Sequence, residues 1–522
     1  MIKLLERLQL GKREAILLAV LWAAWTVEVF IVQEFTLITT YDIPGYKNVI
    51  ARITRVFLDL TGCGLLIMVF WRRALYGVLA VWGVLAAGLS VYASFYGMPL
   101  SFLVITGQAG EGASAVPHLG VLLRHWYIPV IIAFAVGDME IVRRLSKYNP
   151  VARVRLAMIG SLFAANLLVA FTLNLFFPLR ALSPCVPTSA IGTAYGYLWT
   201  WGGEEWYFGR GRILEQALAV ANEGSDQLTP VEAPLELAEK MAVIQVEALD
   251  YEMVGFREKN ELIMPCLTSL AESGMFYRVK PIEGAKSADE DFVMLTGAQP
   301  LVNIMTYRIP GYPFDNALPR IARKLGYETT FLHGYAGEFF GRRTAMIKMG
   351  FEHIWFKEEI PEGKLIPRKS MWGVKDADLL RLAAKQLRES NGKQMQFIIT
   401  LTSHWPYDLL APNEMEVFGN PSSILERYLN CTRYVDNALK EYMTSIPDGT
   451  CVIIYGDHHS QISYEEGGAT GRNGNVPFII YQKGYDLSKN QKTRDTGLAS
   501  SGGLGLLDMA RYLRAQFVRK RV

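Results

Sequence analysis

Hydrophobic residues are concentrated in five long stretches within the first 180 residues, and they recur in shorter runs after residue 240. The long stretches cover residues 15–37, 54–71, 74–95, 121–137 and 156–177. Each approaches the roughly 20 residues that a helix needs to cross the hydrocarbon of a membrane, so we predict about five transmembrane helices. The fourth is the weakest, because Arg124 and His125 lie at its start and Pro129 interrupts it; a re-entrant or interfacial helix is the alternative there.

The basic residues between these stretches alternate in density. They gather before the first stretch, between the second and third, and between the fourth and fifth: Lys3, Arg7, Lys12, Arg13, Arg72, Arg73, Arg143, Arg144, Lys147, Arg153 and Arg155. Because short cytoplasmic loops retain positive charge, this pattern predicts a cytoplasmic N-terminus. Five crossings then place everything after Pro178 outside, whereas four would reverse that side. The first stretch lacks a small-residue cleavage site before Tyr41, so we expect it to be a retained span.

Aromatic residues are frequent in the segment that follows the last stretch. The cluster contains Trp199, Trp201, Trp206, Tyr207 and Phe208, and an amphipathic pattern covers residues 213–221. Because tryptophan and tyrosine favour the headgroup layer, we predict that residues 181–235 are linker helices at the membrane surface. The alternative is that these aromatic residues pack against the globular domain.

Short apolar runs after residue 240 predict an α/β domain over residues 236–522. The expected strands are AVIQV (242–246), TTFLH (329–333), QFIITL (396–401), CVIIYG (451–456) and PFIIYQ (477–482). These runs are continuously apolar, as strands covered on both faces are. Helical patterns lie between them at 262–273, 316–325 and 422–443; the first two end at Gly274 and Gly326, where we expect left-handed caps. Residues 1–180 form the predicted transmembrane domain.

Composition agrees with a chain that is part membrane and part globular. Hydrophobic residues make up 51% of the 522 positions, and the mean hydropathy is +0.16. The 53 basic and 50 acidic residues nearly cancel, so no basic field is available for nucleic acid, and we exclude that partner. The five cysteines are Cys63, Cys185, Cys266, Cys431 and Cys451, and they form no CxxC pair, which argues against a thiolate zinc site. One disulfide among the last four of them stays open.

Chemically active residues follow the predicted strands. Glu247 follows AVIQV, His333 ends TTFLH, His404 comes shortly after QFIITL, and Asp457 with His458 follows CVIIYG. Any one of them has an ordinary structural explanation as a solvated or hydrogen-bonded residue. However, the carboxyl ends of such strands line one crevice, where ligands bind. Carboxylate oxygens with imidazole nitrogens suit one divalent ion, with Mn²⁺, Zn²⁺ and Mg²⁺ as candidates.

Ser287 is the candidate nucleophile. It lies in the segment Glu283 to Phe292, where Ser287 and Glu290 form an S-x-x-E pattern that opens a helix. One interpretation is that Ser287 is a helix N-cap. The other is that a metal ion ionises its hydroxyl for attack on phosphorus, with the helix N-terminus holding the phosphate. The two interpretations are compatible.

Five motifs extend this pattern over most of residues 240–515. They are Val246-Glu247-Ala248, Gly284 to Glu290, His333-Gly334 with Phe340 and Arg342 after it, His404-Trp405-Pro406-Tyr407, and Tyr455-Gly456-Asp457-His458. Together with the five-span N-terminal part, they resemble the lipoteichoic acid synthase group of membrane phosphoglycerol transferases, in the alkaline phosphatase and sulfatase superfamily. The resemblance implies an α-helical membrane domain plus an α/β, alkaline phosphatase-like sulfatase-fold domain outside the cytoplasmic membrane of a bacterium.

The resemblance also implies roles for individual residues. Glu247, Ser287, Asp457 and His458 would bind one metal ion, with Mn²⁺ as the first candidate and Ser287 as nucleophile. The positions that would hold the phosphoglycerol head group are His333, Phe340, Arg342 and His404. Two departures stand out: members of the group carry threonine at the position of Ser287 and tryptophan at the position of Phe340. Serine keeps the hydroxyl, but phenylalanine cannot donate a hydrogen bond, which leaves the head group open.

The implied reaction is two in-line displacements. Ser287 attacks a membrane phospholipid, with phosphatidylglycerol as the expected donor, and expels diacylglycerol. A glycan or polyol phosphate acceptor then takes the group from the phospho-serine. Arg342 would stabilise charge on the phosphoryl oxygens, and His404 would either move a proton or bind substrate.

Four other readings compete with phosphoglycerol transfer. The nearest is a phosphoethanolamine transferase acting on lipid A or an exported glycan, for which His459 and His353 are unassigned candidate ligands. Hydrolysis of the diester by water is another. A sulfatase is disfavoured, because the closest string to a C/S-x-P-x-R signature, Cys185 to Ser189, lacks the arginine. A non-enzymatic envelope sensor with a degenerate fold is disfavoured, because Glu247, Ser287, Asp457 and His458 are all present.

Overall fold

The computed structural model divides the chain into two compact units, Met1–Ile213 and Leu214–Val522. The residues that it describes are 11–37, 45–70, 72–96, 99–108, 126–145, 152–179, 182, 189–208, 212–221, 237–282, 285, 287–302, 304–360, 373–460, 462, 474–487 and 504–519.

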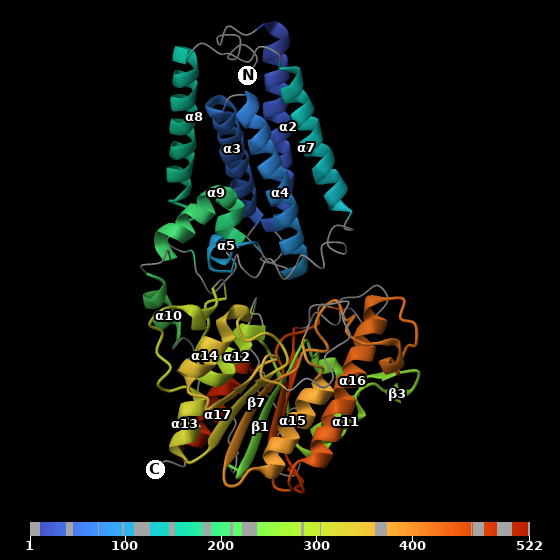
Figure 1. The fold of residues 1–522 in the computed structure, drawn as a ribbon. Coiled ribbons are helices and arrows are strands. Elements are labelled where there is room, and N and C mark those ends of the chain that lie inside the picture. The colour runs from blue at the N-terminus through green and yellow to red at the C-terminus, as the bar shows by residue number, and fades with distance from the viewer. Residues whose placement is uncertain are drawn as a thin grey trace. The chain divides into compact units, whose positions relative to one another are not determined.

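The first unit is a bundle of long apolar helices (Figure 1). One helix lies in each of the five predicted stretches: α2 (Lys12–Leu37), α3 (Gly45–Val69), α4 (Arg72–Tyr96), α7 (Tyr127–Arg144) and α8 (Ala152–Leu173). Among the described residues, three segments are long and apolar enough to cross a membrane: Lys12–Leu37, Arg72–Ala93 and Arg153–Leu173. The helix α3 carries Arg52, Arg55 and Asp59, and α7 has 18 residues with charges in its second half. The count of five crossings therefore stays a prediction, as does the side on which the chain emerges.

The aromatic cluster after the last long helix lies on α9 (Ser189–Phe208). The indole nitrogen of Trp199 donates to Asn166 Oδ1 at 2.9 Å, and that of Trp201 donates to the carbonyl of Leu100 at 2.8 Å. Gly196, with φ 72° and ψ 176°, interrupts the helix between these contacts and its first turns. Two of the predicted interfacial tryptophans therefore make hydrogen bonds to other parts of the first unit. The short helix α5 (Phe102–Gln108) also packs against α9. The boundaries of a linker over 181–235 stay a prediction, and α10 (Ile213–Ala221) lies within that range.

The second unit is built on a seven-stranded sheet with the order β4-β9-β8-β1-β7-β5-β6. Its strands are β1 (Lys240–Val246), β4 (Met275–Val279), β5 (Glu328–His333), β6 (His353–Trp355), β7 (Gln394–Ile399), β8 (Cys451–Gly456) and β9 (Val476–Gln482). The strand β9 runs antiparallel to both of its neighbours, β4 and β8, and the other neighbouring pairs are parallel. A small hairpin, β2 (Arg257–Glu258) with β3 (Glu261–Leu262), is separate from the sheet.

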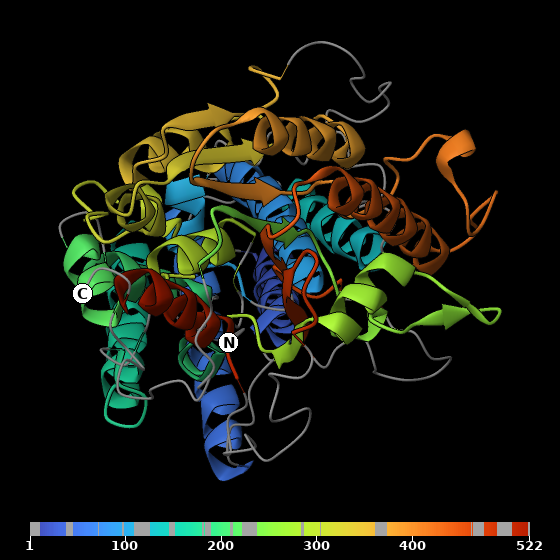
Figure 2. The ribbon, with the colours of Figure 1, turned by 90° about the horizontal axis from the view of Figure 1, so that it is seen from below.

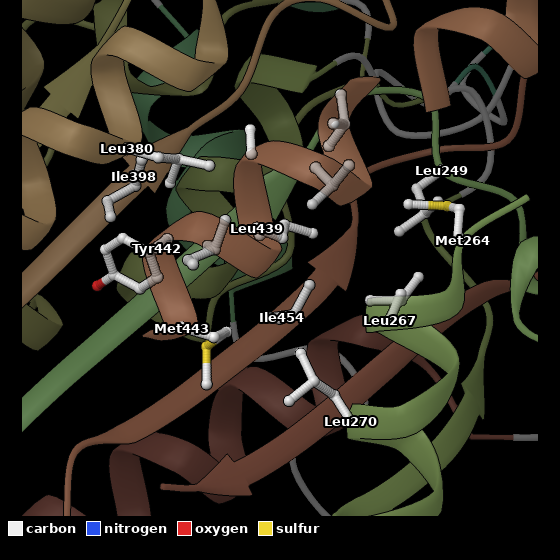
Figure 3. Close-up of a cluster of buried hydrophobic side chains, with 14 of the residues drawn as sticks. Leu249, Met264, Leu267, Leu270, Leu380, Ile398, Leu439, Tyr442, Met443 and Ile454 are labelled. Atoms are coloured by element: carbon white, nitrogen blue, oxygen red, sulfur yellow. The ribbon is translucent and has the colours of Figure 1, made fainter. Parts of the chain in front are cut away.

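Helices cover both faces of the sheet, as Figure 2 shows from below. One layer contains α11 (Pro265–Ser273), α15 (Asp376–Glu389) and α16 (Ile424–Ser445); the other contains α12 (Ser287–Thr296), α13 (Leu318–Lys324), α14 (Arg342–Met349) and α17 (Leu506–Arg519). Figure 3 shows the core beneath the first layer, where Leu380, Leu439 and Leu267 meet Ile398 and Ile454 of the sheet. Each buried leucine or isoleucine contributes about 1.5–3 kcal/mol, so this core holds the strand ends in fixed positions.

The five predicted strands are all present, and the predicted helices are present with small shifts in their ends. Gly326 has the expected positive φ of 84° after α13. The left-handed cap predicted at Gly274 is wrong, since its φ is −102°. Glycine is needed there for space instead, because a Cβ would lie 2.6 Å from the carbonyl oxygen of Ile480. Cys266, Cys431 and Cys451 are free thiols, and Cys185 lies outside the described residues.

Candidate active site

The ends of β1 and β8 bring three candidate ligands together. The two strands are parallel neighbours, and Val246 pairs with Gly456, so the next residues, Glu247 and Asp457, leave the sheet at the same level. A Cβ on Gly456 would lie 2.4 Å from the carbonyl oxygen of Leu249, so only glycine lets these two backbone segments approach this closely. The sheet register thus places the carboxylates of Glu247 and Asp457 at one point of its carboxyl edge.

Glu247, Asp457 and His458 form a compact group whose ligand atoms all lie within 4.8 Å of one another. His458 Nε2 is 3.3 Å from Glu247 Oε1 and 3.7 Å from Asp457 Oδ2. Ser287 joins them from the start of α12: its Oγ lies 3.0 Å from Glu247 Oε2 and 3.2 Å from His458 Nε2. The structure therefore brings all four predicted ligand residues together.

The electrostatics of this group fit a divalent cation. Burial raises the pKa of Asp457 to about 7, and the nearby Glu247 charge adds to that effect. Burial also disfavours the charged form of Glu247, but His404, His458 and the Ser287 hydroxyl outweigh it and hold the pKa of Glu247 below its usual range. The two carboxylates in turn raise the pKa of His458 to about 10 against the effect of burial. Two acidic groups thus compete for one positive charge, a competition that a divalent ion bound among oxygen and nitrogen ligands would relieve.

Neighbouring groups hold these side chains in place. Asp457 Oδ1 accepts hydrogen bonds from the backbone N–H of Ala248 at 2.8 Å and of His458 at 2.7 Å. Ala248 has a φ of 49°, an unusual value for a residue with a side chain, and this left-handed turn aims its N–H at Asp457. His458 Nδ1 lies 3.2 Å from the carbonyl oxygen of His459, an arrangement that directs Nε2 toward the ligand group.

Gln245 was not singled out by the sequence analysis, although a buried glutamine in an apolar strand was a visible signal. Its Nε2 donates to the backbone carbonyl of Ser287 at 3.0 Å, and its Oε1 accepts from Tyr455 OH at 2.6 Å. The side chain is fully buried. Gln245 therefore ties the first turn of α12, and with it Ser287, to the central strands.

The hydrogen bonds of the described residues do not support the interpretation of Ser287 and Glu290 as a helix cap. The described hydrogen bonds of the Ser287 hydroxyl go to Glu247 and His458, and Glu290 Oε1 accepts from the backbone N–H of Ile282 at 2.7 Å. Ser287 is itself the first helical residue of α12. Its hydroxyl is thus part of the ligand group and does not close the helix end.

A second cluster forms around the end of β5. His333 Nδ1 lies 3.1 Å from the carbonyl oxygen of Ile399, and His333 Nε2 lies 3.0 Å from Arg342 Nη1. Arg342 Nε also pairs with Asp291 Oδ2 at 2.8 Å, and the three side chains are buried. Burial, reinforced by the charge of Arg342, lowers the pKa of His333 to about 3. The imidazole is therefore neutral: its Nδ1–H donates to Ile399, and its Nε2 accepts from Arg342.

Phe340 and His404 complete the set of predicted residues. Phe340 belongs to the 3-10 turn η5 (Phe339–Gly341), has a φ of 57°, and lies with its ring centroid 4.2 Å from that of Phe339. His404 Nδ1 lies 2.7 Å from the carbonyl oxygen of Trp405. The charge of His404 affects the pKa of both Glu247 and His333, so its imidazole lies near both clusters.

The two unassigned histidines differ in position. His353 begins β6 and pairs with Glu328, the first residue of β5, at 2.6 Å. That pair lies at the amino end of the sheet and is not part of the ligand group. His459 follows His458 directly and contributes its backbone carbonyl to the site.

Comparison with known proteins agrees with this architecture. Residues 241–500 match the family model described as Sulfatase. This part of the chain therefore has the α/β sulfatase fold. The domain is 22% identical over 248 residues to "Lipoteichoic acid synthase-like YvgJ" of Bacillus subtilis (strain 168), a match that covers 45% of this chain and 39% of that protein. It is 23% identical over 231 residues to "Lipoteichoic acid synthase" of Staphylococcus saprophyticus, with 41% and 35% covered. The resemblance to the lipoteichoic acid synthase group is confirmed, and the matches span little more than a third of those relatives.

One solved structure resembles both units of the chain. It is the "Integral membrane protein lipooligosaccharide phosphoethanolamine transferase A (EptA) from Neisseria meningitidis", with a TM-score of 0.53, 12% identity and 89% of each chain covered. At this identity the likeness shows the fold alone. It confirms an N-terminal helical membrane domain followed by an α/β sulfatase domain.

Proposed function

We propose that the chain transfers a phosphoglycerol head group from a membrane phospholipid to a glycan or glycerol phosphate acceptor outside the cytoplasmic membrane. One observation carries the proposal: the Ser287 hydroxyl lies 3.0 Å from Glu247 and 3.2 Å from His458, within the group that Asp457 completes. Lipoteichoic acid synthases among the relatives support the same class of reaction. The chain's own acceptor would be a hydroxyl of an envelope polymer.

The ligand group would hold the divalent ion through Glu247, Ser287, Asp457 and His458. An ion bound there would favour the ionised serine and offset negative charge on the phosphoryl oxygens. Mn²⁺ is the first candidate and Zn²⁺ the second, since both accept carboxylate and imidazole ligands. "Crystal structure of the C-terminal periplasmic domain of EcEptC from Escherichia coli- complex with Zn" is one of the related structures.

The chain's own residues would perform the two displacements. Ser287 Oγ, which donates to Glu247 Oε2, would lose its proton to solvent and form a bond to phosphorus, while the bond from phosphorus to the diacylglycerol oxygen breaks. His404, in its protonated form, would give a proton to the departing oxygen. In the second step the acceptor hydroxyl would give its proton to His404 and form the new bond to phosphorus, while the bond from phosphorus to Ser287 Oγ breaks and Oγ takes up a proton from solvent.

Arg342 and His333 would bind the phosphoryl and head-group oxygens. Two of the three guanidinium nitrogens of Arg342 are occupied by Asp291 and His333, whereas Nη2 has no hydrogen-bond partner among the described residues. A buried donor without a partner is unfavourable, and a phosphoryl oxygen would satisfy it. Phe340, two residues before Arg342, has a half-buried side chain that would contact the head group.

A phosphoethanolamine transferase is the second candidate, favoured by Phe340 and by the likeness of the whole fold to EptA. The phenyl ring offers no hydrogen bond to a glycerol hydroxyl. Cationic groups nearby argue against a charged amine: Arg308 Nε donates to the carbonyl of Phe340 at 2.7 Å, and Lys357 Nζ lies 5.3 Å from the ring centroid of Tyr335. An uncharged glycerol avoids repulsion from these cations.

A donor-competition assay tests the proposal. The full chain, reconstituted in vesicles with Mn²⁺, receives phosphatidylglycerol and phosphatidylethanolamine in equal amounts, each with a distinguishable diacylglycerol part. We expect diacylglycerol release from phosphatidylglycerol, dependent on Ser287. Release from phosphatidylethanolamine alone would favour the second candidate, and no Ser287-dependent release from either lipid would contradict the transferase.

A further inference from the structure

Asp291 lies on the same helix as the proposed nucleophile and contacts the proposed phosphoryl-binding arginine. The helix α12 begins at Ser287, and Asp291 follows four residues later, so both side chains lie on one face, about one turn apart. Asp291 is fully buried, and its Oδ2 accepts from Arg342 Nε at 2.8 Å. A single helical turn thus connects the serine hydroxyl to the guanidinium.

The guanidinium of Arg342 is held from two sides. Asp291 fixes Nε, and His333, itself anchored to the carbonyl of Ile399, fixes Nη1. These contacts leave Nη2 as the remaining nitrogen, without a hydrogen-bond partner among the described residues. The direction of that donor is therefore determined by Asp291 and His333 together.

The backbone before Arg342 is held as well. Phe340 and Gly341 both have positive φ, 57° and 71°, and α14 begins directly after them with Arg342. Arg308 Nε donates to the carbonyl of Phe340 at 2.7 Å across this turn. Arg308 belongs to the turn η4 (Thr306–Arg308), whose buried Tyr307 has its hydroxyl near Arg342, although the two do not form a hydrogen bond of regular geometry. The backbone of Arg342 is thus held by the preceding turn, and its guanidinium is held by the carboxylate of Asp291.

We propose that Asp291 is a positioning residue for head-group transfer: through α12 it holds Arg342 at a set distance and angle from Ser287. This inference rests on the proposed function. Asp291 also balances the charge of the buried guanidinium, so the pair is neutral before a substrate arrives. The phosphoryl group is then recognised by the direction of a donor more than by net positive charge, and small displacements of that donor are costly for the reaction.

Single-turnover kinetics of the full chain in vesicles test this role, with phosphatidylglycerol as donor and the Ser287 adduct measured by mass spectrometry. The rate constant reports how well the groups are aligned, whereas the amplitude reports how much enzyme is folded. For Asp291→Asn we expect the rate constant to fall about ten- to a hundredfold while the amplitude is retained. In an Arg342→Ala background the same substitution should leave the rate constant unchanged, because Asp291 acts through Arg342.

Asp436→Asn is the matched control. Asp436 is buried too, but it accepts from the backbone N–H groups of Cys266 and Leu267 at the start of α11. We expect it to lower the amplitude or the melting temperature and to leave the rate constant unchanged. If Asp291→Asn does not fold, Asp291→Glu should fold and show a smaller decrease in the rate constant, since it keeps the charge and shifts its position.

Two results would overturn the inference, and they are distinguishable from failure of the proposed function. The first is a wild-type rate constant in Asp291→Asn, with or without a lower amplitude. The second is an equal further decrease in the Arg342→Ala background, which would show a role independent of Arg342. Failure of wild-type protein to form any adduct at Ser287 would instead contradict the proposed transfer itself.

Discussion

The hydroxyl of Ser287 donates to the carboxylate of Glu247 across 3.0 Å, and this contact joins the start of α12 to the end of the central strand β1. The serine is the first residue of its helix, and the glutamate directly follows its strand. The contact therefore depends on two element boundaries at once.

Substitution of Ser287 separates hydroxyl chemistry from structure. Ser287→Ala should abolish diacylglycerol release, because no other group in the ligand set can form the phospho-ester, while Ser287→Thr should retain activity. Unfolding free energy should change by no more than about 1 kcal/mol, the typical contribution of one hydrogen bond. Lipid turnover and thermal unfolding measure the two effects. Activity above a tenth of wild type in Ser287→Ala would indicate another nucleophile.

Binding of a divalent ion should stabilise the sulfatase domain. An ion at a hundred times its dissociation constant adds about 2.7 kcal/mol, so Mn²⁺ or Zn²⁺ should raise the melting temperature and a chelator should reverse the effect. Asp457→Asn should weaken binding at least about tenfold, because it removes one of the converging ligands. His353→Ala is the control, since His353 pairs with Glu328 at the other end of the sheet. Equal ion binding in Asp457→Asn and wild type would place the ion elsewhere.

Arg342 should be intolerant of exchange even for another cation. Lysine cannot contact Asp291 and His333 at the same time as a phosphoryl oxygen, so Arg342→Lys and Arg342→Ala should both lower kcat/KM for the lipid donor by about a hundredfold or more. The neighbouring Arg343 provides a control, because it pairs with Glu338, Glu358 and Glu359. Arg343→Ala should keep kcat/KM within about twofold. Unchanged donor kinetics in Arg342→Ala would contradict its head-group role.

The neutral state of His333 predicts a pH dependence of stability. Its pKa is lowered from 6.5 to about 3 by burial and by Arg342, so the folded chain stays unprotonated there while the unfolded chain takes up a proton below pH 6.5. Stability should therefore fall as the pH falls from 6.5 toward 3, by up to about 1.4 kcal/mol per pH unit for this one group.

Comparison with His333→Asn isolates that contribution, since the other titrating groups are shared. The difference in unfolding free energy between wild type and variant should shrink as the solution is acidified below pH 6.5. Parallel stability curves for the two proteins between neutral and acidic pH would show that His333 is protonated in the folded state.

The predicted five crossings would place the domain that follows them outside the cytoplasm. A reporter enzyme that works only outside, fused after the last residue of the full chain, should be active, and a cytoplasmic reporter at the same position should be inactive. Fusions after α7 should give the opposite result, since the basic residues Arg143 and Arg144 end that helix. A cytoplasmic signal at the C-terminus would contradict the five-span topology and require an even number of crossings.

The sequence predicted the central strands because each is a continuous apolar run, and β1, β5, β7, β8 and β9 all lie where these runs are. The edge strands β4 and β6 were missed: β4 contains the exposed Arg278, and β6 has only three residues, so neither gives a strong pattern. The misread Gly274 has a similar cause, because its need for space comes from Ile480 on a strand that is distant in sequence.

The residues at the strand ends were predictable because their positions follow from the sheet, whereas the residues that support them were not. Asp291 and Gln245 form hydrogen bonds with groups on other helices and strands, and no local sequence pattern identifies those partners. A signal was present nonetheless: Asp289, Glu290 and Asp291 are three successive acids on a helix that is buried throughout its last nine residues. Buried acids next to a candidate nucleophile are expected to have specific partners.

Mass spectrometry of the protein after incubation with phosphatidylglycerol vesicles tests the central claim most directly. Protein quenched within the first turnover and digested should yield the peptide that contains Ser287 with the added mass of phosphoglycerol on that residue. The adduct should be absent from Ser287→Ala and from protein treated with a chelator. An unmodified Ser287 peptide from protein that is releasing diacylglycerol, or an adduct on a different residue, would contradict the account.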